Sequence, residues 1–269
     1  MSRLTLRSGL VVVTVLLLAG ACGWKRAANA AVSGGTAGIY SGSVTYYRFP
    51  GPVVSPPRRL LGAIRKDGVG YFIWVYPTTG DVQVFRRLAG YGTITSFEYE
   101  VPPEGHMAAR GAQKWEIRIE PGISSGQPHR LLGKFNRVDG YAALELRELP
   151  PTRRYTSLAS RSGLYRGVDS SRRGRASITL HSDGNLSGTN AAGCRIAGHL
   201  TRAGGTDLFD VHMTLAGAPA CRRRITGVAF FGTRARSGGF SAAGPYLYLI
   251  GASGDFGHGV AMVLMRWSK

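Results

Sequence analysis

Acidic residues are scarce in this chain of 269 residues. Fifteen aspartates and glutamates stand against 34 lysines and arginines, which gives a formal net charge of +19 at pH 7. The acidic residues are also dispersed, so the sequence offers no carboxylate pair for general acid and base catalysis. The excess of positive charge instead favours anionic partners, because the summed field of the chain attracts them.

Patterns of common catalytic sites are missing as well. No Gly-rich stretch continues into a helical segment, which argues against a phosphate-binding loop. Residues 122–126 read Gly-Ile-Ser-Ser-Gly and match the G-x-S-x-G pattern, but a nucleophile elbow needs a strand before it and a helix after it, and Pro121 and Pro128 indicate a loop. The six histidines are scattered. We therefore expect no enzyme, no catalytic residue, no cofactor and no metal site.

The N-terminus has the features of a secretory signal peptide. Arg3 and Arg7 supply positive charge, and residues 10–18 form an apolar run interrupted only by Thr14. This run is shorter than the roughly 20 residues that a membrane-spanning helix needs. Small residues at 19–21 then lead into Cys22.

Residues 17–22, Leu-Leu-Ala-Gly-Ala-Cys, resemble the lipobox of bacterial lipoproteins, although Leu stands one place further from the cysteine than is usual. The resemblance implies a signal peptide over 1–21, a lipid on Cys22 and a flexible lipidated tether over 22–36. Gly23 rather than Asp follows the cysteine, so we expect an outer-membrane location in a Gram-negative host. The alternative is ordinary cleavage after residues 28–30, which would remove Cys22.

Three cysteines are an odd number for an exported protein. If Cys22 carries the lipid, Cys194 and Cys221 remain and can form a disulfide in an oxidising compartment. Two alternatives stay open: a pair of free buried thiols, or a zinc site with His199 and His212, for which no close Cys-x-x-Cys or His-x-x-x-His pair is present.

Short apolar segments between Gly, Asp and Pro predict an all-β protein with little helix. The clearest strand is 113–120, where Trp115, Ile117 and Ile119 share one face. Eight strands are expected in each half, which suits two tandem antiparallel barrels or, alternatively, two sandwiches. The expected strands are 37–49, 59–66, 70–77, 81–88, 92–101, 113–120, 131–137 and 140–148, then 163–168, 176–181, 185–189, 195–202, 207–216, 222–232, 245–252 and 258–268.

Both halves begin with the same Gly-apolar-Tyr-x-Gly pattern, at residues 38–42 and 163–167, which suggests an internal duplication. We expect a first β domain over 37–149, a basic linker over 150–162 rich in Pro, Arg and Ser, and a second β domain over 163–269. Large residues are expected to fill the barrels: Trp74, Phe97, Trp115, Phe135, Phe230 and Tyr248.

The second half resembles a group of proteobacterial lipoproteins built from small β-barrel repeats. The resemblance rests on residues 182–188 (SDGNLSG), 193–198 (GCRIAG) and Cys221, and more loosely on 67–72 and 90–93 in the first half. It implies a secreted β domain with paired cysteines and carries no activity. A more distant likeness to lipocalin-type and transferrin-binding-protein-type barrels concerns architecture alone.

Positive charge is concentrated in the second half. Residues 36–150 hold 14 basic and 10 acidic side chains, a net +4, whereas residues 151–269 hold 16 and 5, a net +11. Either this is a generic basic surface, or it binds an anionic partner such as lipopolysaccharide or acidic phospholipid, without specific reading of nucleic acid. The candidate anion-binding residues are Arg172, Arg173, Arg175, Arg222, Arg223 and Arg224.

These observations favour a non-enzymatic envelope lipoprotein with a structural or binding role, held at the membrane by its N-terminal lipid. The alternative is a carrier that encloses a small apolar ligand in a lipocalin-like barrel, since eight strands can just enclose one. Large inward side chains favour filled barrels over carriers.

Overall fold

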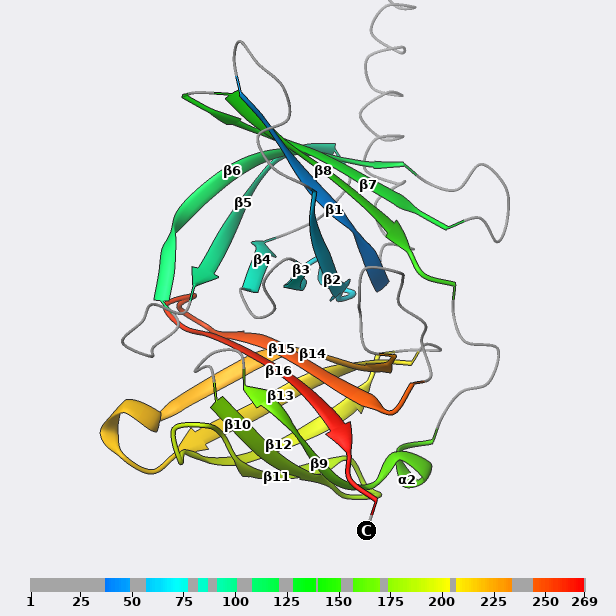
Figure 1. Ribbon diagram of the computed structural model, residues 1–269, viewed down its shortest axis with the longest axis vertical. Coiled ribbons are helices and arrows are strands. Elements are labelled where there is room, and N and C mark those ends of the chain that lie inside the picture. Colours follow the sequence, from blue (N-terminus) through cyan, green and yellow to red (C-terminus); the bar gives the residue numbers. More distant parts are fainter. Residues whose placement is uncertain are drawn as a thin grey trace, which may run out of the picture. The chain divides into compact units, whose positions relative to one another are not determined.

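The computed structural model of the protein describes residues 37–48, 57–76, 82–86, 91–100, 108–120, 128–138, 140–150, 157–169, 174–203, 207–233 and 244–268. Outside these residues lie Cys22 with the expected signal peptide and tether, residues 122–126, and both Arg172 and Arg173. The described part of the chain is almost entirely β (Figure 1), as the sequence predicts. Within it, no helix is long and apolar enough to cross a membrane.

Eight antiparallel strands form the first barrel. Each strand pairs with the next along the chain, and β1 also pairs with β8, so the pairing returns to its start. The strands are β1 (Gly38–Arg48), β2 (Arg58–Ile64), β3 (Gly70–Tyr76), β4 (Val82–Arg86), β5 (Tyr91–Glu100), β6 (Ala108–Glu120), β7 (Arg130–Arg137) and β8 (Gly140–Glu148).

The second barrel has the same topology, with β9 paired to both β10 and β16. Its strands are β9 (Gly163–Asp169), β10 (Gly174–Leu180), β11 (Asn185–Thr189), β12 (Arg195–Arg202), β13 (Leu208–Ala216), β14 (Arg223–Gly232), β15 (Tyr246–Ser253) and β16 (Gly259–Arg266). A short helix, α2 (Leu158–Arg161), precedes β9, and a 3-10 turn, η2 (Pro219–Cys221), precedes β14.

All sixteen predicted strands are confirmed, and most of their ends fall within two residues of the prediction. The largest difference is β6, which begins at Ala108 rather than at residue 113. Residues 108–112 are Ala-Ala-Arg-Gly-Ala and show no alternation of large apolar side chains. Their strand conformation depends on pairing with β5, where Ala108 lies opposite Glu100.

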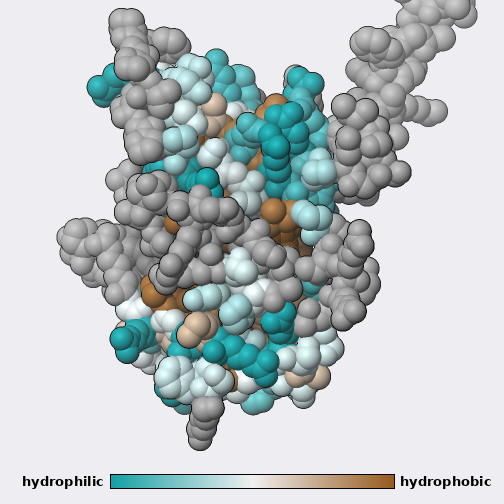
Figure 2. All heavy atoms as spheres, turned by 45° about the vertical axis from the view of Figure 1, so that its right-hand side comes forward, coloured by the Kyte–Doolittle hydropathy of each residue, from teal (hydrophilic) through white to brown (hydrophobic). Residues whose placement is uncertain are grey.

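Alternating side chains fill the inner face of each barrel, as period-two geometry requires. Many of the coloured surface residues in Figure 2 are hydrophilic. The second barrel has the larger inner cluster, to which every one of its strands contributes, with Tyr165, Phe209 and Phe231 among its largest members. In the first barrel, the inner cluster is built around Tyr40, Phe72, Trp74, Phe85 and Trp115. The predicted inward positions of Trp74, Trp115 and Phe135 are therefore confirmed, whereas the side chain of Phe97 lies outside the described set.

A third apolar cluster joins the outer faces of the two barrels within the compact unit of residues 36–269. Its members from the first barrel are Ile39, Leu61, Ala63, Tyr71, Ile73 and Val84; those from the second are Ala203, Leu208, Val228, Phe230, Tyr248, Ile250, Ala252 and Ala261. We call this set the shared cluster. At the same contact, Arg65 Nε lies 3.0 Å from Asp210 Oδ1, and burial raises the pKa of Tyr71.

The shared cluster overturns one prediction. Phe230 and Tyr248, expected to fill a barrel, point outward and stack with their ring centroids 5.1 Å apart. Their neighbours Phe231 and Leu247 point inward instead. Both faces are buried over residues 227–232 of β14 and 247–252 of β15. These stretches carry no charged residue, and the sequence alone does not show which face is the inner one.

The repeated Gly-apolar-Tyr-x-Gly pattern occupies equivalent places in the two barrels. Tyr40 on β1 and Tyr165 on β9 are both buried in inner clusters. Gly42 lies opposite Leu146 of β8, and Gly167 lies opposite Leu264 of β16. A Cβ atom at Gly42 would come within 1.9 Å of a backbone carbonyl oxygen, and one at Gly167 within 2.2 Å, so both sites exclude a side chain. This equivalence supports the expected internal duplication.

Phe230→Ala tests the shared cluster. We expect a loss of about 3 to 5 kcal/mol in the free energy of unfolding, the usual range for truncating a buried Phe. Because the lost contacts join the two barrels, calorimetry should resolve two unfolding transitions where the wild-type chain shows one. The matched control is Phe231→Ala, which should lower stability without selectively separating the barrels. Identical calorimetric profiles for the two variants would contradict the joining role of Phe230.

Candidate functional site

A disulfide closes one end of the second barrel. Cys194 and Cys221 are bonded, with their Cα atoms 5.5 Å apart, so the predicted bridge is confirmed and the free-thiol and zinc-thiolate alternatives are ruled out. His199 and His212 face each other across β12 and β13, and His199 Nδ1 lies 3.0 Å from Asn185 Oδ1. A crosslink over 27 residues contributes about 3 to 4 kcal/mol in the chain-entropy estimate.

The bridge brings together arginines that are distant in the sequence. Arg195 follows Cys194 at the start of β12, and Arg222 follows Cys221 just before β14. Arg195 and Arg224 lie on the outer faces of strands that flank β13, and their partners on β13 are two residues apart, so about 12 Å separates their backbones. The β13 residues opposite them, Ala216 and Thr214, are small.

Arg195, Arg222 and Arg224 are all exposed, and we call them the arginine cluster. Arg223, between the last two, is half-buried. Sequence reasoning selected residues 222–224 but missed Arg195. The position of Arg195 directly after Cys194 could have identified it, but that position is informative only when Cys194 is known to pair with Cys221.

Within the described residues, no member of the arginine cluster forms an ion pair. The five acidic residues of the second half are committed elsewhere or buried. Asp210 pairs with Arg65, and Asp169 Oδ2 accepts a hydrogen bond from the Ala191 amide. Asp183 is hydrogen-bonded by Asn185, and Asp255 by Ser253 and Gly257; these hydrogen bonds lower the pKa of both carboxyls. Asp207 is buried.

The structure places Arg175 apart from the other described residues of the predicted anion-binding set, residues 222–224. Arg175 lies on the outer face at the start of β10, four strands around the ring from β14. It therefore shares one end of the barrel with residues 222–224 but not their side. The four described members of the set therefore do not form one surface.

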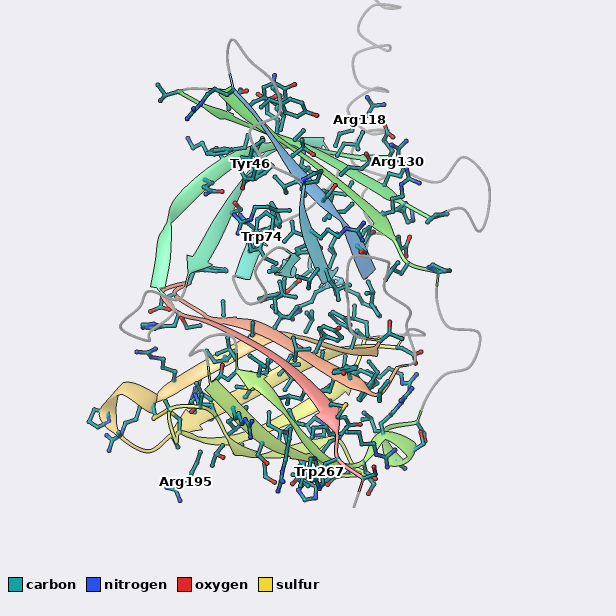
Figure 3. The ribbon with its side chains drawn as sticks, viewed as in Figure 1. Tyr46, Trp74, Arg118, Arg130, Arg195 and Trp267 are labelled. Carbon is teal, nitrogen blue, oxygen red and sulfur yellow. A yellow bond between two sulfur atoms is a disulfide. The ribbon has the colours of Figure 1, made fainter. Side chains whose placement is uncertain are left out.

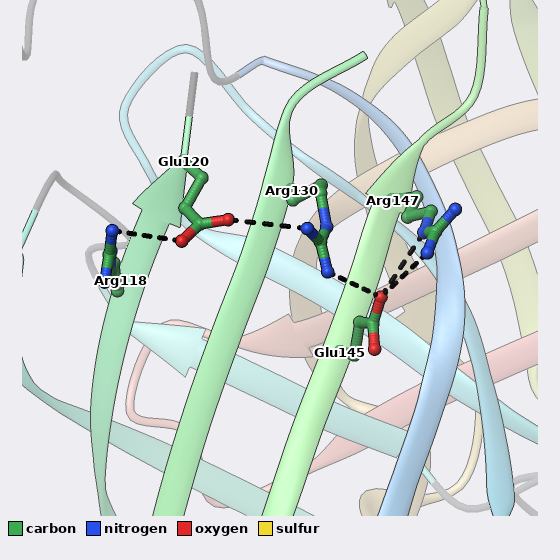
Figure 4. Close-up of polar contacts among 5 residues, drawn as sticks. All are labelled: Arg118, Glu120, Arg130, Glu145 and Arg147. Atoms are coloured by element: carbon green, nitrogen blue, oxygen red, sulfur yellow. Dashed lines mark hydrogen bonds and ion pairs between the residues drawn. The ribbon is translucent and has the colours of Figure 1, made fainter. Parts of the chain in front are cut away.

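Three arginines on β6 to β8 of the first barrel form ion pairs, in contrast to the arginine cluster. Figure 4 shows a ladder of alternating charges across β6, β7 and β8. Arg118 pairs with Glu120 at 3.1 Å. Arg130 lies 3.7 Å from Glu120 and 3.1 Å from Glu145, and Arg147 pairs with the same Glu145 at 3.1 Å. Hydrogen bonds from Arg147 and Arg130 lower the pKa of Glu145. Each exposed pair adds less than about 1 kcal/mol to stability, but the ladder neutralises most of the positive charge on this face.

Polar side chains also gather inside the first barrel. Gln83 Nε2 donates to Ser96 Oγ at 2.9 Å, and Gln83 and Ser96 are both buried. Trp115 Nε1 donates to Gln113 Oε1 at 3.4 Å. The indole N–H of Trp74 is buried without a hydrogen-bond partner among the described residues.

The unpaired indole lies near one end of the first barrel, where the guanidinium of Arg58 stacks 4.2 Å from the Trp74 ring (Figure 3 labels Trp74). Leaving a buried donor unpaired costs about 1 to 3 kcal/mol. In the second barrel, the hydroxyl of Tyr165 in the inner cluster donates to the Arg161 carbonyl at 2.6 Å, and the buried Asp169 carboxylate accepts from the Ala191 amide. The Trp74 indole differs from these groups because no described residue accepts its hydrogen bond.

Comparison of the chain with protein-family models, curated proteins and solved structures found no match.

Proposed function

We propose that the protein is a non-enzymatic envelope lipoprotein whose second barrel binds an anionic envelope component. The observation that carries this proposal is the arginine cluster: three exposed arginines near a disulfide, with no ion pair to a described residue. The guanidinium group presents a planar fork of donors that suits phosphate, so phosphorylated lipid or lipopolysaccharide is the expected ligand class. Such binding is weak and sensitive to salt because the arginines are exposed.

The proposal includes an arrangement in two tandem barrel domains, 37–149 and 163–269, behind a signal peptide over 1–21 and a tether over 22–36. Equivalent topology and the repeated glycine pattern support two domains. Part of the expected linker, 150–162, contacts the second barrel: Leu158 packs against its inner cluster, and the Arg161 guanidinium lies 5.2 Å from the Phe231 ring. We place the protein at the outer membrane through a lipid on Cys22.

Cys22→Ser tests the anchor. We expect the variant to move from the membrane fraction into the soluble fraction, because the lipidated residue is lost. Detergent-phase partitioning of both proteins from the same cells measures the change. A processed wild-type chain that carries no lipid by mass spectrometry, or a variant that stays in the membrane fraction, would count against the lipoprotein assignment.

Simultaneous Arg195→Ser, Arg222→Ser and Arg224→Ser substitutions test the arginine cluster. Binding to vesicles of acidic phospholipid at low salt should fall by about tenfold or more, since each charged hydrogen bond is worth about 1.5 kcal/mol or more. The matched control replaces Arg118, Arg130 and Arg147 by Ser, which removes the same formal charge from the paired ladder and should have a smaller effect. Equal losses in the two triple variants would assign binding to net charge alone.

A carrier function in the first barrel is the second candidate, and the unpaired Trp74 indole favours it. A buried donor without a partner is satisfied when a bound molecule or water supplies an acceptor. Together with Gln83, Ser96 and Gln113, it would give an otherwise aromatic inner face a small number of polar contacts, as ligand sites typically have. The fitting ligand is small and largely apolar, with one hydrogen-bond acceptor.

Titration with a fluorescent fatty acid tests the carrier function. Saturable binding is expected, and Trp74→Phe should weaken it by about fivefold or more, because the substitution keeps a ring but removes a hydrogen bond worth about 1 kcal/mol or more. Trp115→Phe is the control, since the Trp115 indole already donates to Gln113. Absence of saturable binding to the wild-type chain would exclude this ligand class.

A further inference from the structure

Large exposed apolar side chains of the described residues concentrate in one place. There are four: Val138 in a turn of the first barrel, and Val168, Met265 and Trp267 in the second. The last three are 47%, 44% and 47% exposed. Val168 belongs to β9, Met265 to β16, and Trp267 to the segment directly after β16. Strands β9 and β16 pair with each other.

The strand register places these three side chains on one outer surface. Tyr165 and Leu264 point into the second barrel, so their sequence neighbours point outward. Arg166 lies opposite Met265 in the pairing of β9 with β16. The Trp267 amide donates to the Leu164 carbonyl at 2.7 Å, which continues the pairing beyond β16.

Two arginines border this apolar surface. The Arg166 guanidinium lies 4.8 Å from the centre of the Trp267 ring, and Figure 3 shows Trp267 near the C-terminal end of the chain. Arg175 lies opposite Val168 in the pairing of β9 with β10. We call Arg166, Val168, Arg175, Met265 and Trp267 the β9–β16 patch.

The β9–β16 patch carries positive charge only. Asp169 is the one acidic residue in β9, β10 and β16, and it is fully buried with its carboxylate bonded to the Ala191 amide. Surface tryptophan beside arginine suits the boundary between phosphate groups and hydrocarbon, because the indole has an apolar body and a polar N–H. Exposed apolar residues grouped with cations also match the composition of membrane-surface elements.

We propose that the β9–β16 patch docks on an anionic bilayer, with Trp267, Met265 and Val168 entering the interface and Arg166 and Arg175 meeting phosphate groups. The argument for a bilayer is charge complementarity, since such a surface offers anions and hydrocarbon together. This inference deepens the proposed function, on which it rests for the envelope location. It identifies a second membrane contact, on strands other than those of the arginine cluster.

The experiment uses the full chain carrying Cys22→Ser and Trp24→Phe, so that neither the lipid nor a tryptophan of the N-terminal segment contributes. Vesicles contain equal parts phosphatidylcholine and phosphatidylglycerol, with brominated acyl chains as quenchers. Bromine should quench tryptophan fluorescence on binding, and Trp267→Phe should abolish that quenching, because Trp74 and Trp115 are buried inside the first barrel.

Val168→Ser with Met265→Ser should weaken vesicle binding by about tenfold, since partial burial of both side chains is lost. Val138→Ser, a change at an exposed turn of the first barrel, is the control and should bind as the parent chain does. Unchanged binding of the double variant, or quenching that persists in Trp267→Phe, would overturn the docking proposal. Self-association of the parent chain that the double variant abolishes would overturn it in favour of a contact between copies.

The arginine-cluster triple variant in the same vesicles separates this inference from the proposed function. If only the cluster proposal fails, the triple variant binds as the parent chain does, and the Trp267 signal remains. If only the docking proposal fails, the triple variant loses binding while the β9–β16 patch variants do not.

Discussion

Burial of the outer faces of β2, β3 and β14 to β16 is the constraint on which the arrangement of this protein depends. A small barrel ordinarily exposes its outer face to water, and its strands then alternate between apolar and polar residues. Here the shared cluster buries Leu61 and Ile73 from one barrel against Phe230 and Ile250 from the other. The stretches of these strands that supply the shared cluster carry apolar outer residues, so the charge lies on other strands and at strand ends beyond the cluster, as Arg224 does on β14.

The distribution of charge follows from this division. In the first barrel, the exposed ladder on β6 to β8 pairs each glutamate with arginine. In the second, acidic side chains are buried, bonded within turns or committed to Arg65. The arginine cluster and the arginines of the β9–β16 patch therefore keep their positive charge available to an external anion. Both surfaces arise from the same shortage of acidic residues and differ in their apolar content.

Much of the fold could be predicted because local patterns encode it. Period-two alternation and turn residues located all sixteen strands, and the cysteine count predicted the bridge between Cys194 and Cys221. Arg195 was missed because its relation to Arg222 exists only through that bridge. Phe230 and Tyr248 were placed on the wrong face because an uninterrupted apolar strand contains no mark of inside and outside. The anchor at Cys22 stays a prediction.

By itself, the sequence determined the all-β fold class, the number of strands, the pairing of cysteines and the excess of positive charge. Each of these follows from composition or from neighbours along the chain. Only the tertiary structure decided which apolar face is shared between barrels, which arginines meet across β13, and that Val168, Met265 and Trp267 form one surface. Those relations depend on ring closure, which brings β9 against β16 although nearly the whole second half of the chain separates them. Such long-range pairing leaves no signature in any local stretch of residues.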